Sequence, residues 1–211
     1  MSALVFSSIL KVFDKIIDIL KYREEKRERK LYLILPEFIG YMDEVHKDYL
    51  DVLSTAKNSL EAAVQDGIQA DTQKEALIEV ANYVRQREAD RLRERRSCQE
   101  LASLLGSSPA IPDDCRLLFQ LSARYFESGA FGEEFSDQFR DSRREKRDAP
   151  VSNVRETMYR LETLIHMYST DATNLSPKIR ALQTFLTSSI RLKNSLWSEI
   201  GTVYARALVS L

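Results

Sequence analysis

The histidines and cysteines are the first side chains to consider for chemistry, and the sequence has two of each. His46 follows Asp43 by three residues and His166 follows Glu162 by four, so each pair would share one face of a helix. The dimetal centres of helical bundles use two Glu-x-x-His pairs and two further glutamates. One pair here has Asp in place of Glu and the other has the wrong spacing, so we predict no metal site.

The cysteines and glycines do not indicate catalysis either. Cys98 and Cys115 belong to no CxxC or Cys/His motif, and two cysteines are typical of a protein kept reduced. The sequence lacks a Gly-x-Ser-x-Gly motif, and its six scattered glycines build no phosphate-binding loop. We therefore expect a non-enzyme with no cofactor and no small-molecule substrate.

The scarcity of turn residues indicates the fold class. The 211 residues include only six glycines and five prolines, whereas a β-sandwich or barrel of this length needs many more. Apolar residues make up 44% and charged residues 30%, which excludes compositional disorder. We predict an all-α protein, an elongated bundle of about six helices, three of them about 30 residues long.

Start and stop signals predict main helices over about 2–30, 31–67, 72–105, 113–128, 153–168 and 176–211. Pro36 is expected near the start of the second helix, because proline suits a first turn and is poor in a helix interior. The stretch 140–152 is charged and lacks apolar periodicity. We therefore expect an N-terminal bundle over 1–139, a linker over 140–152, and a C-terminal helical pair over 153–211 that packs on the same bundle.

The first predicted helix carries ten large apolar residues within an arc of roughly 180°. They are Val5, Phe6, Ile9, Leu10, Val12, Phe13, Ile16, Ile17, Ile19 and Leu20. Three interpretations stay open: a core helix, a helix that docks on a partner or a second copy, and a helix that lies in a membrane interface. Charged residues interrupt this apolar run, so it is not expected to span a membrane.

Three basic clusters raise the possibility of nucleic-acid binding. Residues 21–30 and 85–96 each hold six basic and three acidic residues, and 140–148 hold five basic and three acidic ones. Interleaved acids weaken a phosphate-binding interpretation. For 85–96 we favour pairing with acids of the second helix, if the second and third helices form an antiparallel hairpin.

These patterns predict a cytoplasmic, non-catalytic interaction protein, a subunit or adaptor of a larger assembly. A protein partner or self-association is expected. The alternatives are an effector that contacts a membrane peripherally through its amphipathic first helix and, less favoured, a nucleic-acid accessory protein. The candidate partner-binding residues are Ile16, Ile17, Leu20, Arg91, Arg95, Trp197, Tyr204 and Leu208.

Overall fold

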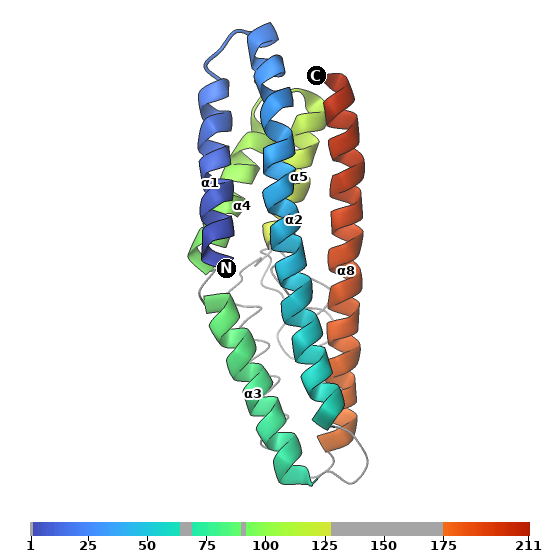
Figure 1. Cartoon of the computed structure of the whole chain (residues 1–211). Coiled ribbons are helices and arrows are strands. Elements are labelled where there is room, and N and C mark those ends of the chain that lie inside the picture. The colour runs from blue at the N-terminus through green and yellow to red at the C-terminus, as the bar shows by residue number, and fades with distance from the viewer. Residues whose placement is uncertain (1, 64–68, 90–91, 128–174) are drawn as a thin grey trace, which may run out of the picture. The chain divides into compact units, whose positions relative to one another are not determined.

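The computed structural model of the chain describes residues 2–63, 69–89, 92–127 and 175–211 (Figure 1). These residues form six helices: α1 (Ser2–Ile19), α2 (Glu24–Ala63), α3 (Ala70–Ala89), α4 (Leu92–Ser107), α5 (Asp113–Glu127) and α8 (Leu175–Ser210). The described ranges contain no strand, which confirms the all-α prediction. The predicted linker over 140–152 and the helix over 153–168 lie outside them, so the division into domains stays a prediction.

The expectation of three helices of about 30 residues is not confirmed. Helix α2 has 40 residues and α8 has 36, whereas α3 and α4 have 20 and 16. Helices α3 and α4 both fall where the sequence predicted one helix over 72–105, and residues 90–91 between them lie outside the described residues.

The predicted boundary between the first two helices was wrong. Helix α1 ends at Ile19, and the backbone N–H of Tyr22 donates to the carbonyl of Ile19 in the turn that follows. Helix α2 then begins at Glu24 and continues through Pro36. The helix loses one backbone hydrogen bond there because proline has no N–H, and Pro36 itself is exposed while the opposite face of α2 stays buried.

The described residues divide into two compact units, of which the first comprises 2–49, 92–127 and 193–211. In this unit α4 packs against both α1 and α5. Its core includes three phenylalanines, and the ring of Phe38 in α2 lies 5.3 Å from that of Phe13 in α1 and 5.5 Å from that of Phe119 in α5. Offset and edge-on aromatic contacts of this kind add to the stabilisation from apolar burial.

The apolar face of α1 belongs to the core of this first unit. Ile9, Val12, Phe13 and Ile16 each expose 0% of their surface. Of the three interpretations of this helix, the burial in this structure agrees with the core helix. Among the described helices, none is long and apolar enough to cross a membrane.

The second unit comprises, in its described part, 50–63, 69–89 and 175–192. Its buried apolar side chains come from the C-terminal part of α2, from α3 and from the N-terminal part of α8. They include Leu53, Leu60, Leu77, Val80, Ile179 and Leu186. Each of these helices therefore contributes one apolar face to the interior.

Candidate functional site

A cluster of polar and aromatic side chains, all buried except the partly exposed Trp197, lies inside the first unit, where four helices contribute to it. Its members are His46 and Tyr49 of α2, Arg95 of α4, Tyr125 of α5, and Lys193 and Trp197 of α8. Arg95 exposes 2% of its surface and Lys193 exposes 0%. Charged side chains are almost never buried this completely unless they have partners, so the cluster needs an explanation.

His46 and Tyr125 form the neutral part of the cluster. The Nδ1 atom of His46 lies 2.8 Å from the Tyr125 hydroxyl, and the imidazole stacks on the Trp197 ring at 5.1 Å. Burial lowers the pKa of His46, against the opposing effect of a hydrogen bond with Asn194, and raises that of Tyr125 well above its ordinary value. The Tyr125 hydroxyl therefore keeps its proton, the imidazole is favoured in its uncharged form, and the two groups share one hydrogen bond.

Lys193 and Arg95 form the charged part of the cluster. The Nζ atom of Lys193 donates to the backbone carbonyl of Tyr125 at 3.0 Å and lies 4.1 Å from the Tyr125 ring centroid and 4.9 Å from that of Tyr49. Arg95 Nη1 donates to the Tyr49 hydroxyl at 3.3 Å. Cation–π contacts and hydrogen bonds offset part of the desolvation of both cations.

The geometry suits this cluster to holding helices together. The three hydrogen bonds described above each join two different helices, and His46 is 5% exposed. Both cysteines are buried, and burial raises the pKa of the Cys115 thiol to about 12, which disfavours the reactive thiolate at that residue. No group of three or more potential metal ligands occurs in the part of the chain that the structure describes.

The second feature is an exposed apolar stretch on α2. Between residues 31 and 42 only Glu37 is charged, so this segment is apolar nearly all round. One face is buried, with Leu31, Leu35, Phe38 and Met42 at 0% exposure. On the opposite face Leu33 is 69% exposed, and Pro36 and Gly40 are exposed as well. Apolar residues therefore stand where a surface helix normally carries polar ones.

Pro36 and Gly40 have no evident role inside the chain. In a helix interior, proline costs about 3 kcal/mol and glycine about 1 kcal/mol relative to alanine. A Cβ added at Gly40 would meet nothing within 4 Å, so no internal packing requires glycine there. Steps of three or four positions place both residues on one face with Arg29, Leu33 and Glu44, all exposed. We call these five residues the outer face of α2.

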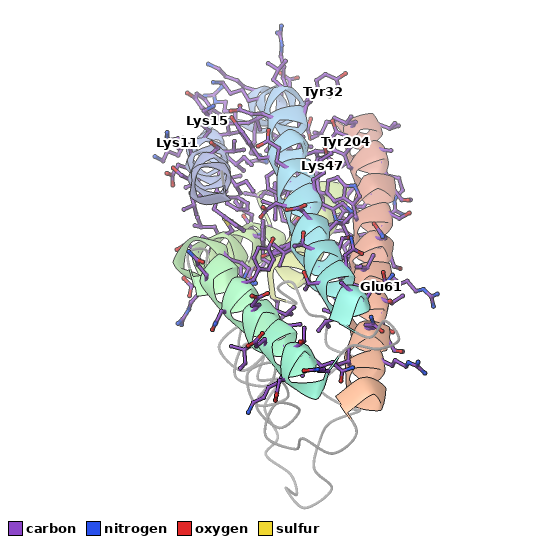
Figure 2. All side chains as sticks on the ribbon, turned by 60° about the horizontal axis from the view of Figure 1, so that its bottom comes forward. Lys11, Lys15, Tyr32, Lys47, Glu61 and Tyr204 are labelled. Carbon is purple, nitrogen blue, oxygen red and sulfur yellow. The ribbon has the colours of Figure 1, made fainter. Side chains whose placement is uncertain are left out.

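Figure 2 labels Tyr32 and Lys47, which belong to the same part of α2, and Tyr204 of α8. Tyr32 is 49% exposed and lies near enough to Tyr204 to contribute to the raised pKa of its hydroxyl, of which burial is the main cause. Lys47 forms an ion pair with Asp43 of the same helix. The outer face of α2 is therefore bordered by an aromatic pair on one flank and by charged residues at its end.

The structure distributes the eight candidate residues over different environments. Ile16 and Arg95 are buried, so neither side chain is available to a partner in this structure. Those of intermediate exposure are Ile17, Leu20, Trp197, Tyr204 and Leu208, whereas Arg91 lies outside the described residues. Arg95 and Trp197 come together in the buried cluster, 102 positions apart in the sequence.

Sequence reasoning does not single out the outer face of α2, because a proline indicates a position near a helix start rather than in its interior. The signal was present in the 31–42 segment, since a helix that is apolar all round needs cover on every side. No family model, no curated protein and no solved structure matches this chain.

Proposed function

We propose that the chain is a cytoplasmic, non-catalytic interaction protein, a subunit or adaptor of a larger assembly, and that it binds a protein partner through the outer face of α2. The observation that carries this proposal is the 69% exposure of Leu33 on a face that also presents Pro36 and Gly40. Burying one leucine side chain contributes roughly 1.5–3 kcal/mol, which a partner would gain.

The composition of the outer face agrees with the usual anatomy of a protein interface. An apolar centre formed by Leu33 and Pro36 is flanked by Arg29 on one side and Glu44 on the other. Interfaces commonly have a desolvated apolar centre and a polar rim that remains near water. Gly40 allows a partner's backbone or large side chain to approach closely, because no side chain stands in the way.

A photo-cross-linking experiment tests the proposal. A benzophenone amino acid is placed at Leu33 in one version of the chain and at Leu104 in the other. Leu104 is a matched control, because it is 59% exposed and lies on α4. We expect a discrete cross-linked protein product from position 33, in cells of the native host, and none from position 104. Equal yields at both positions, or no product at position 33, would sink the proposal.

The two alternative functions stay predictions. A membrane-associating effector would have to release α1, whose Ile9 and Ile16 are fully buried. Co-flotation of the folded chain with anionic vesicles tests that alternative. In the basic cluster over 21–30, Lys21 pairs with Asp18, and the ammonium groups of Lys26 and Lys30 lie 4.9 and 4.3 Å from the Tyr22 ring centroid. These cations have partners within the chain, which favours the interaction protein over nucleic-acid binding.

A further inference from the structure

We infer that the partner of the outer face of α2 is a second copy of this chain, docked with its α2 antiparallel to the first. This inference rests on the proposed function, because it uses the same surface and names its occupant. The exposed residues of this face fit a second copy in two ways, by shape and by charge, because of their positions along α2.

The apolar fit centres between Pro36 and Glu37. When two copies of α2 meet there about a twofold axis, Leu33 of one copy stands opposite Gly40 of the other, each about 5 Å from the centre along the helix. Leu33 is 69% exposed, and Gly40 leaves open space where a side chain would be. In the symmetric contact, Leu33 of each copy therefore packs into the open space beside Gly40 of the other copy.

The charges match in the same register. Arg29 and Glu44 lie at equal distances of about 11 Å on either side of the centre, so each arginine faces the partner's glutamate. Both residues are exposed. A parallel arrangement would instead set arginine against arginine and glutamate against glutamate, which is unfavourable. One turn further out, Lys26 would face Lys47, but Lys47 is already paired with Asp43 on its own helix.

The contact is expected to be weak. One helix-on-helix contact of this length buries less than the roughly 1,200 Å² at the lower end of standard interfaces. A dissociation constant in the micromolar range follows, so the dimer forms at high concentration and dissociates on dilution. With such a dissociation constant, the ratio of dimer to monomer changes with the local concentration of the chain.

Sedimentation equilibrium of the purified full chain, up to about 200 µM, tests the inference. The wild type should dimerise. Arg29→Glu and Glu44→Arg should each weaken dimerisation by about fivefold or more, and the double variant should restore it because the charges are exchanged. Gly40→Leu should also abolish the dimer while favouring the helix of the monomer, and Leu104→Glu on α4 should leave the dimer unchanged.

Two results would overturn the inference: a wild type that stays monomeric throughout the range, or a dimer that the charge reversals and Gly40→Leu do not affect. Circular dichroism of each variant shows whether it has folded. A chain that is monomeric when pure but still cross-links from position 33 to a different protein refutes self-association and leaves the proposed function standing. If the pure chain stays monomeric and position 33 gives no cross-linked product, both self-association and the proposed function are refuted.

Discussion

Replacing Gly106 by alanine should destabilise the first unit, against the ordinary preference of helices for alanine. Gly106 lies in the last turn of α4 and is buried against α5. A Cβ at this position would lie 2.7 Å from Cγ of Gln120, 3.0 Å from its backbone nitrogen and 3.3 Å from its Cα. The side-chain atom can rotate away, but the two backbone atoms can move only if α5 shifts.

The magnitude follows from three contributions. Alanine in a helix interior gains about 1 kcal/mol over glycine, and less near a helix end. Overpacking of a close contact costs about 1–3 kcal/mol. The side chain of Gln120 also donates to the Gly106 carbonyl at 2.7 Å, and disturbing that hydrogen bond costs about 1 kcal/mol more. We expect a net loss of about 1–3 kcal/mol in the free energy of unfolding.

Urea unfolding followed by tryptophan fluorescence measures this loss. Trp197 is the single tryptophan and belongs to the first unit, so its emission reports on the unit that contains Gly106. The matched control is Gly201→Ala in the interior of α8, where an added Cβ meets nothing within 4 Å. That variant should gain about 0.5–1 kcal/mol. The reasoning is refuted if Gly106→Ala is as stable as Gly201→Ala.

Two further predictions concern titratable groups. Burial lowers the pKa of His46 below its ordinary 6.5, so the unfolded chain binds the proton more readily. The unfolding free energy of the first unit should therefore be constant just above that value and fall by up to about 1.4 kcal/mol per unit as the pH drops below it. His46→Gln should remove this slope in urea titrations, and an unchanged slope would contradict the prediction. With its pKa raised to about 12, the buried Cys115 thiol should resist a thiol reagent at pH 8 until urea unfolds the chain. Mass spectrometry measures the extent of labelling, and rapid labelling of Cys115 under native conditions would contradict the prediction.

Local signals predicted the fold class and several helix boundaries. The few glycines and the apolar periodicity indicated helices, and the described residues contain helices alone as regular structure. Pro112 marked the start of α5 at Asp113. This position was predictable because the lack of a proline N–H acts between neighbours in the chain.

The buried cluster could not be predicted in the same way, because its contacts join distant segments. Arg95 stands in a stretch rich in charge, which sequence reasoning assigned to the surface or to ion pairs. Its burial depends on Tyr49, 46 positions away, and that of His46 depends on Tyr125, 79 positions away. Tertiary packing also explains Pro36, since the buried face of α2 stabilises a helix that proline alone would interrupt.

The bond from Lys193 to the Tyr125 carbonyl also has a consequence for the order of folding. Lys193 donates from α8 to a backbone carbonyl near the last described residue of α5, at 3.0 Å. Because the two residues are 68 positions apart, this bond cannot form until the chain has been synthesised as far as α8. Helix α5 should therefore gain its full stability late, when α8 docks on it.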